Sequence, residues 1–279
     1  MSKKILVLGA TGTVGRPVVA GLLARGEAVK AASRSGQSVG DAEGVAFEFD
    51  SPGMISSALD DVDRAYVLIP AGYMGVQDSL LPIVAEAAKR QVKVVFQSVV
   101  GANANDSIPY RQVEIAIEKS GSPFVILRPN WFSDNFHSFW KEDLDRGTIA
   151  LPAGEGKSSF IDARDIADSA IMALTSTSFD GKAFNLSGPE ALNYAEAAAI
   201  LSDVIGKPIH YAATSDETFI AGLKSVGVPG DYATVLASIF YPVREGWTSA
   251  VTDDVMVLTG RAPRSLKTYA VDNALLLTA

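Results

Sequence analysis

Short apolar runs alternate with amphipathic stretches through the first half of the chain. Runs that are apolar throughout are typical of strands buried on both faces of a parallel sheet. Six such strands are predicted, at residues 5–8, 27–33, 45–50, 65–69, 92–97 and 124–127. Helical spacing occurs between them, most clearly at residues 14–25, 79–90 and 110–119. This order predicts an α/β fold, a doubly wound parallel sheet of the Rossmann type.

The pattern changes after Pro129, where aromatic residues become frequent and most of the predicted elements are helices. The shorter elements expected there are strands at 148–151, 160–161, 183–186 and near 209–212, and a helix at 165–174. We therefore expect a dinucleotide-binding domain over residues 1–130 and a smaller, mainly helical substrate lobe over 131–279. Segments near 159–187 are expected to return to the first domain.

Three glycines lie between the first predicted strand and the first predicted helix, with the spacing G-x-x-G-x-x-G. In such a loop one glycine permits a tight turn, another lets a pyrophosphate approach the backbone, and the third permits close contact between helix and strand. The helix N-terminus adds unpaired N–H groups for the phosphates. The alternative is an ordinary turn without a ligand. The expected contacts to a cofactor are Gly9, Thr11, Gly12, Thr13, Val14 and Gly15.

The end of the second strand indicates which dinucleotide binds. An NAD site usually has an acidic residue there, whereas this chain has Arg34. An arginine can pair with the 2′-phosphate of NADPH, so NADPH (NADP⁺) is favoured over NADH. A solvated surface arginine is the alternative. Asp50, at the end of the third predicted strand, could accept from the adenine amino group or serve as a charge at the start of the next helix.

Composition narrows the function classes. The 279 residues are 48% hydrophobic and contain no cysteine. The net charge of −8 disfavours binding to the negatively charged backbone of a nucleic acid. His137 and His210 are the only histidines, and no metal-ligand cluster can be assembled. No run approaches the ~20 apolar residues of a membrane helix. We expect a cytoplasmic monomer or homodimer that acts on a small molecule.

Several motifs together resemble the NmrA-like group of atypical short-chain dehydrogenase/reductases. They are GATGTVG at 9–15, Ser33-Arg34, and the segments at 121–129, 134–135, 160–166, 187–190 and 252–264. The sequence is similar to type 2 NADPH:quinone reductases, triphenylmethane dye reductases and reductases of ergot-alkaloid iminium intermediates. The resemblance implies the same Rossmann-type fold and an NAD(P)H-dependent oxidoreductase.

One departure from typical short-chain dehydrogenases concerns proton transfer. Their Tyr-x-x-x-Lys motif lowers the tyrosine pKa, but here Tyr110 is followed four residues later by Glu114, as is usual in the NmrA-like group. A carboxylate opposes tyrosinate formation. Tyr110, as a neutral hydrogen-bond donor, and Ser98 are the candidate catalytic residues. A tyrosine at a helix start and a serine that caps local backbone are the alternatives.

A site without the Tyr–Lys pair suits acceptors that take hydride without full proton transfer, such as a quinone, an iminium ion or a cationic dye. The predicted function is therefore NADPH-dependent reduction of a small conjugated or aromatic electrophile. The alternative is a non-catalytic NADP(H) sensor that binds a protein partner. An isomerase or dehydratase is disfavoured by the weak acid–base equipment.

The nicotinamide is expected at the carboxyl ends of strands four to six. The residues predicted to contact it follow those strands: Ile69, Pro70, Ser98, Val99 and Pro129. Predicted substrate contacts are Tyr73, Asn130, Trp131, Phe132 and Phe136. For the aromatic residues the alternative is core packing, because Phe132, Phe136, Phe139 and Trp140 have the spacing of one buried helix face.

Overall fold

The computed structural model describes residues 3–278 and divides into two compact units. The sheet unit contains residues up to 129, 163–186 and 254–261, and the helical unit contains 130–162, 187–253 and the residues from 262 onward. Within residues 3–278, no helix is both long enough and apolar enough to cross a bilayer.

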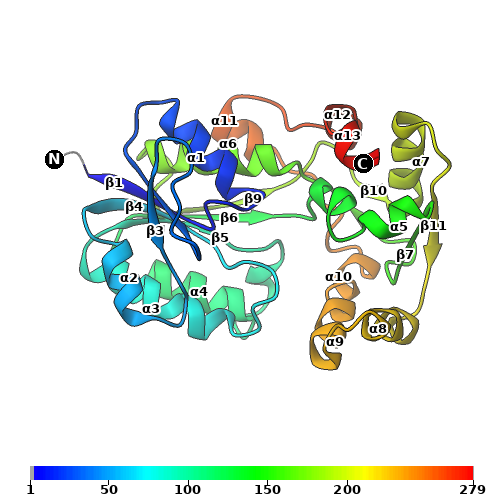
Figure 1. The fold of residues 1–279 in the computed structure, drawn as a ribbon, viewed down its shortest axis with the longest axis horizontal. Coiled ribbons are helices and arrows are strands. Elements are labelled where there is room, and N and C mark those ends of the chain that lie inside the picture. The colour runs from blue at the N-terminus through cyan, green and yellow to red at the C-terminus, as the bar shows by residue number, and fades with distance from the viewer. Residues whose placement is uncertain (1–2, 279) are drawn as a thin grey trace. The chain divides into compact units, whose positions relative to one another are not determined.

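A seven-stranded parallel sheet forms the centre of the sheet unit (Figure 1). Its order is β3-β2-β1-β4-β5-β6-β9, so the direction of winding reverses between β1 and β4. This confirms the predicted doubly wound fold, whose ligands bind at such a reversal point, beyond the carboxyl ends of the strands. The strands are β1 (Lys4–Leu8), β2 (Val29–Ser33), β3 (Glu43–Ala46), β4 (Val62–Val67), β5 (Lys93–Gln97), β6 (Phe124–Pro129) and β9 (Lys182–Leu186).

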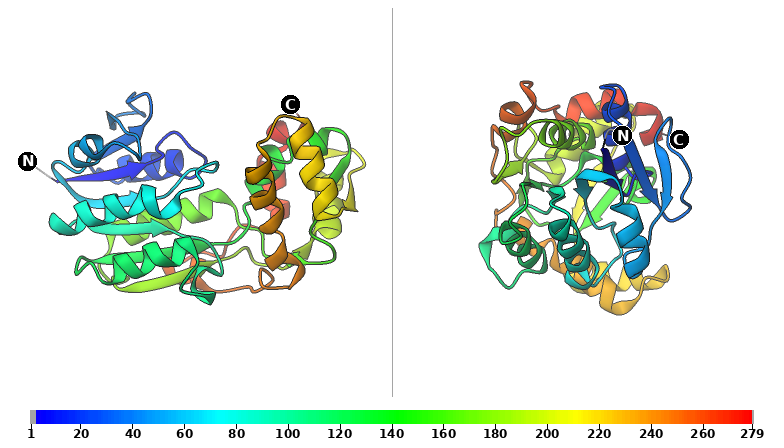
Figure 2. Two further views of the ribbon diagram at one scale, coloured as in Figure 1. Left: turned by 90° about the horizontal axis from the view of Figure 1, so that it is seen from below. Right: turned by 90° about the vertical axis from the view of Figure 1, so that its left-hand side faces the viewer.

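Helices cover both faces of this sheet, which is why its central strands are apolar on both sides. Helices α2, α3 and α4 lie on one face and α1, α6 and α11 on the other (Figures 1 and 2). Gly21 lies where α1 meets α6: a Cβ there would lie 2.3 Å from Ile171 Cδ1, so the end of the Ile171 side chain would have to shift. The helices are α1 (Gly15–Leu23), α2 (Pro52–Ala58), α3 (Val76–Lys89), α4 (Pro109–Glu118), α6 (Ala163–Thr175) and α11 (Asp254–Thr259), with the 3₁₀ turn η1 (Ala102–Ala104).

The helical unit is built on an aromatic core. Tyr194 is fully buried and its ring contacts those of Trp140, Phe160 and Tyr211. Helices α8 and α9 lie side by side (Figure 2). The elements are η2 (Ser133–His137), α5 (Lys141–Asp145), β7 (Thr148–Leu151), β8 (Lys157–Ser158), β10 (Leu192–Asn193), α7 (Tyr194–Ile205), β11 (His210–Ala213), α8 (Asp216–Ser225), α9 (Gly230–Ser238), α10 (Tyr241–Arg244), α12 (Leu266–Asp272) and α13 (Ala274–Thr278).

The third strand is shorter than predicted. The apolar pattern predicts it over residues 45–50, but it spans Glu43–Ala46. Phe47 and Phe49 are buried and continue the alternating pattern. The last bond to the neighbouring strand is from Phe47 N to Ser33 O, because β2 ends at Ser33. The apolar alternation therefore continues by packing after pairing has stopped.

One expectation in the helical unit, the strand at 160–161, is wrong, and the core alternative does not hold for Phe139. Residues 160–161 form no strand but only an isolated bridge between Phe132 and Ile161, because Ile161 N donates to Trp131 O and the surrounding bonds are irregular. Phe139 is 71% exposed rather than buried. The 3₁₀ helix η2 ends at His137, and Ser138 has a non-helical backbone with φ of −123° and ψ of −91°, so no helix continues to Phe139.

Candidate functional site

The glycine loop makes a tight turn between β1 and α1. Gly9 has φ of +63°, a conformation that favours glycine, and Gly12 N donates to Gly9 O over 2.8 Å. A Cβ at Gly15 would lie 2.1 Å from Gly9 O, so only glycine lets the helix start this close to the strand. At Gly12 a Cβ would meet only Gly9 O, at 3.2 Å, and the residue is exposed. Gly12 is therefore the glycine at which a ligand can approach the backbone.

The start of α1 provides donors that fit a phosphate group. Among residues 3–278, no acceptor takes a hydrogen bond from the amides of Thr13, Val14 or Gly15. Val14 and Gly15 are buried, and Thr11 to Thr13 are exposed. Unpaired amides at a helix N-terminus bind anions. The loop therefore fits the pyrophosphate of a dinucleotide.

Arg34 follows β2 in a compact turn. Gly36 N donates to Ser33 O over 3.2 Å, and Ser33 Oγ lies 3.4 Å from Ser35 Oγ. Arg34 is exposed, and within the described part of the chain its guanidinium forms no ion pair. A free cation with two nearby hydroxyls fits the 2′-phosphate of NADPH. Residues 33–36 include no acidic residue that would repel this phosphate.

Asp50 does not end a strand, since β3 stops four residues earlier at Ala46. It is exposed, in a turn that precedes α2.

The ring of Phe49, next to Asp50 in the chain, contacts that of Tyr73, with centroids 5.0 Å apart. Tyr73, a predicted substrate contact, is 37% exposed.

The segments after β5 and β6 remain paired beyond the regular strands. Ser98 N donates to Leu127 O over 2.7 Å, and Val100 N donates to Pro129 O over 3.0 Å. Val99 is partly exposed, whereas Pro129 is buried. After β4, Ile69 is buried and Pro70 partly exposed. The predicted nicotinamide contacts thus all lie at the carboxyl edge of the sheet.

Ser98 belongs to a buried ionic network. Its hydroxyl is buried and donates to Glu114 Oε1 over 2.6 Å. The Arg128 guanidinium donates two hydrogen bonds to the same carboxylate, from Nε to Oε1 over 2.9 Å and from Nη2 to Oε2 over 2.7 Å. Arg111 adds a bond to Oε2 at 3.0 Å. The proton of Ser98 is therefore used within the protein, and the residue orients a carboxylate.

Glu114 is ionised in this setting. Burial alone would raise its pKa, but hydrogen bonds from Arg128 and Ser98, with the positive charge of Arg128, hold the pKa below its ordinary value. The position that holds lysine in typical short-chain dehydrogenases is thus occupied by a salt-bridged anion.

Tyr110 lies one turn before Glu114 in α4 and is partly buried. Its ring stacks on that of Phe96 in β5, with centroids 6.4 Å apart. The ring is therefore fixed against the sheet.

In the helical unit, two predicted substrate contacts are buried. Phe136 is fully buried among aromatic rings, as the core alternative proposed. Asn130 is buried; its Nδ2 donates to Ser159 Oγ and Thr248 O at 2.6 and 2.7 Å. Trp131 and Phe132 remain partly exposed.

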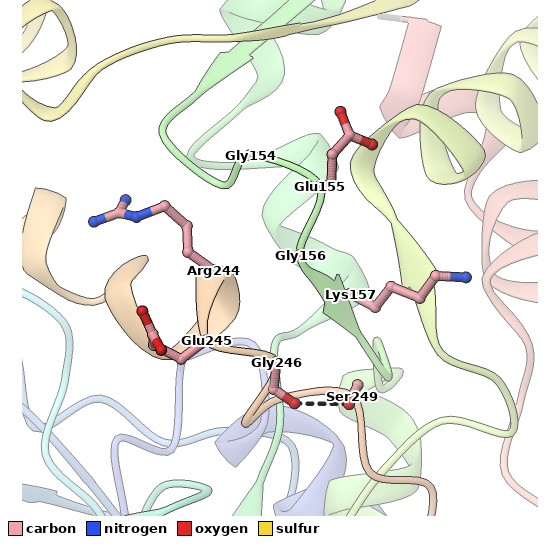
Figure 3. A pocket seen from close by; sticks show the side chains of 8 residues that line it. All are labelled: Gly154, Glu155, Gly156, Lys157, Arg244, Glu245, Gly246 and Ser249. Carbon is pink, nitrogen blue, oxygen red and sulfur yellow. Dashed lines mark hydrogen bonds between the residues drawn. The ribbon is translucent and has the colours of Figure 1, made fainter.

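The helical unit also has an open pocket of about 450 Å³ (Figure 3). Its two cations are already paired: Arg244 forms two bonds to Asp216, and Lys157 lies 3.3 Å from Glu196. Figure 3 shows Arg244, Glu155 and Lys157 pointing away from one another. The pocket therefore presents no converging set of reactive groups. It is lined by Gly154, Glu155, Gly156, Lys157, Arg244, Glu245, Gly246 and Ser249.

Sequence reasoning missed the partner of Glu114. The signal was present, because Arg128 stands in an otherwise apolar strand and a buried arginine needs a carboxylate. The sequence did not reveal which of several acids would reach it.

Known proteins resemble this chain along nearly its whole length. A model of the NmrA-like family matches residues 1–247. An uncharacterized oxidoreductase of Bacillus subtilis, YesF, is 33% identical over 97% of this chain and 95% of its own. The NAD(P)H azoreductase of Xenophilus azovorans is 30% identical over 97% of this chain and 98% of its own.

Among solved structures, an NADPH-dependent quinone oxidoreductase from Escherichia coli, crystallised with NADPH, shares the fold. Its TM-score is 0.86 at 23% identity, covering 97% of this chain and 99% of that one. The motif resemblance, the doubly wound sheet and the family match agree, and this chain belongs to the NmrA-like family.

Proposed function

We propose that this protein is an NADPH-dependent reductase of small conjugated or aromatic electrophiles, of the quinone, iminium or cationic dye type. The observation that carries the proposal is the state of Glu114, a buried carboxylate bound by Arg128 where a proton-transfer lysine would stand. The names of the azoreductase and quinone oxidoreductase relatives support the same class of reaction.

The cofactor would be held by two features of the sheet unit. The amides of Thr13, Val14 and Gly15 would bind the pyrophosphate, and Arg34 would pair with the 2′-phosphate. NADPH supplies a hydride when bound.

The substrate preference follows from the acid–base groups. A tyrosine needs a nearby cation to become a strong acid at neutral pH, and the group four residues after Tyr110 is an anion. Tyr110 would therefore serve as a neutral hydrogen-bond donor. That suffices when the hydride cancels the positive charge of an iminium ion or a dye, or when a quinone delocalises the negative charge that the hydride brings. Trp131 and Phe132, which are partly exposed, are the proposed contacts for a flat substrate.

The test is NADPH oxidation at 340 nm against quinones, iminium ions, cationic dyes and unactivated ketones. We expect turnover with the activated acceptors and little with the ketones, which need a proton donor. Ketone reduction at comparable rates would contradict the proposal. Tight NADPH binding without oxidation by any acceptor would favour a sensor.

A further inference from the structure

Gln97 ends β5 on the sheet face opposite to the ionic network. Its neighbours point toward α4, since Phe96 stacks on Tyr110 and Ser98 donates to Glu114. Side chains alternate along a strand, so Gln97 points to the other face, which α1 and α6 cover. The glycine loop leads into α1 on that same face.

Tyr66 fixes the orientation of the Gln97 carboxamide. Tyr66 lies on the neighbouring strand β4, is fully buried, and its hydroxyl donates to Gln97 Oε1. Burial raises the pKa of Tyr66, so the phenol keeps its proton and remains the donor. The acceptor side of the carboxamide is thereby occupied.

The donor side of the carboxamide is available. Within residues 3–278, no acceptor takes a hydrogen bond from Gln97 Nε2, which carries two N–H groups. Gln97 is partly exposed, whereas the other four residues of β5 are buried. An immobilised donor therefore faces accessible space at the edge of the sheet where ligands bind.

This donor lies near the glycine loop. Tyr66 is in register with Val7 of β1, two residues before Gly9. The order β1-β4-β5 puts Gln97 two strands from β1, roughly 10 Å at about 4.8 Å per strand. A dinucleotide bound at the loop is long enough to cover that distance.

We propose that Gln97 binds the dinucleotide by donating from Nε2 to one of its oxygen acceptors, with Tyr66 as the residue that positions the carboxamide. The inference rests on the proposed function, because it requires a cofactor at the glycine loop. A glutamine that served only solvent would not need a fully buried tyrosine to fix one end of it.

The first test is the dissociation constant of NADPH, measured by calorimetric titration of Gln97→Glu. This variant keeps an acceptor for Tyr66 but removes both donors and adds negative charge, so we expect NADPH to bind about tenfold more weakly or worse. The control is Gln91→Glu, the same change at the opposite end of β5, which should bind like wild type. Equal affinity in both variants would overturn the inference, whereas a wild-type protein that does not bind NADPH would overturn the proposed function.

A second comparison tests the positioning role and does not depend on the folding of Gln97→Glu. Tyr66→Phe should weaken NADPH binding several-fold in the wild-type background and not in a Gln97→Met background. Thermal unfolding of each variant identifies the folded ones. The same loss in both backgrounds, or none in either, would contradict a role of Tyr66 through Gln97.

Discussion

Arg34 shows how much of the cofactor choice depends on one side chain. It is exposed, stands in a turn with two serines, and has no ion-pair partner among the described residues. An unpaired cation of this kind contributes little to the stability of the fold, so its effect should appear in binding.

We predict that Arg34→Ala weakens NADPH binding about ten- to a hundredfold and leaves NADH binding unchanged, because only NADPH has the 2′-phosphate. Titration of both cofactors tests this. Arg25→Ala is the matched control. Arg25 is exposed like Arg34, but it follows the C-terminal end of α1, which is the end away from the glycine loop. Equal affinities of wild type for the two cofactors would disprove the assignment.

Glu114 is predicted to stabilise the fold rather than transfer protons. Glu114→Gln leaves Arg128 buried without its counter-charge, and breaking such a pair usually costs about 3–5 kcal/mol. Urea unfolding measures this. The folded variant should keep turnover, and loss of turnover with unchanged stability would mean that Glu114 has a chemical role.

The same network gives a pH dependence. The pKa of Glu114 is lowered in the folded state, so the ionised carboxylate adds to the free energy of unfolding. This stabilisation is fully present above the pKa of the unfolded state, near 4.5, and is lost as the pH falls through the pKa of the folded state. The free energy of unfolding of wild type should therefore fall more steeply below pH 4.5 than that of Glu114→Gln. Parallel slopes would contradict an ionised Glu114.

At the scale of an element, two glycines between β1 and α1 have different roles. Gly15 lets the helix start close to the strand, and Gly12 leaves room for a ligand at the backbone. Gly15→Ala should destabilise the protein by about 1–3 kcal/mol, because its Cβ would overlap Gly9 O. Gly53→Ala in α2 is the control, since a Cβ there meets nothing within 4 Å.

Gly12→Val should give a folded protein that no longer binds NADPH normally, because the branched side chain would occupy the space of the pyrophosphate. Circular dichroism and NADPH titration separate the two effects. Normal binding by a folded Gly12→Val protein would show that the loop is not the cofactor site.

The elements also show what a sequence can predict. The order of strands and helices in the sheet unit followed from apolar runs, because strands buried on both faces leave a local signal. The end of β3 did not, because pairing stops where the neighbouring strand β2 stops, at Ser33, and the run around Phe47 does not reveal where its partner ends. Phe136 and Phe139 differ in burial because η2 ends at His137, between them, and residue spacing alone does not reveal where the helix ends.

Candidate site residues divide in the same way. The glycine loop and Arg34 were predictable, because each is set by contiguous residues. The partner of Ser98 was not, since Glu114 comes from α4 and its main cation from β6. The buried pairing of Asn130 with Thr248 likewise joins segments 118 residues apart.

At the scale of the whole molecule, the proposed activity is hydride transfer from NADPH to a small electrophile. The most direct measurement follows NADPH at 340 nm and a cationic dye at its visible band in the same cuvette with wild-type protein. We predict that one NADPH is consumed for each dye molecule bleached, and that Tyr110→Phe slows this by less than about 10²-fold, the lower range of general acid catalysis. Bound NADPH that stays unoxidised while dyes, quinones and iminium ions remain unchanged would contradict a reductase function.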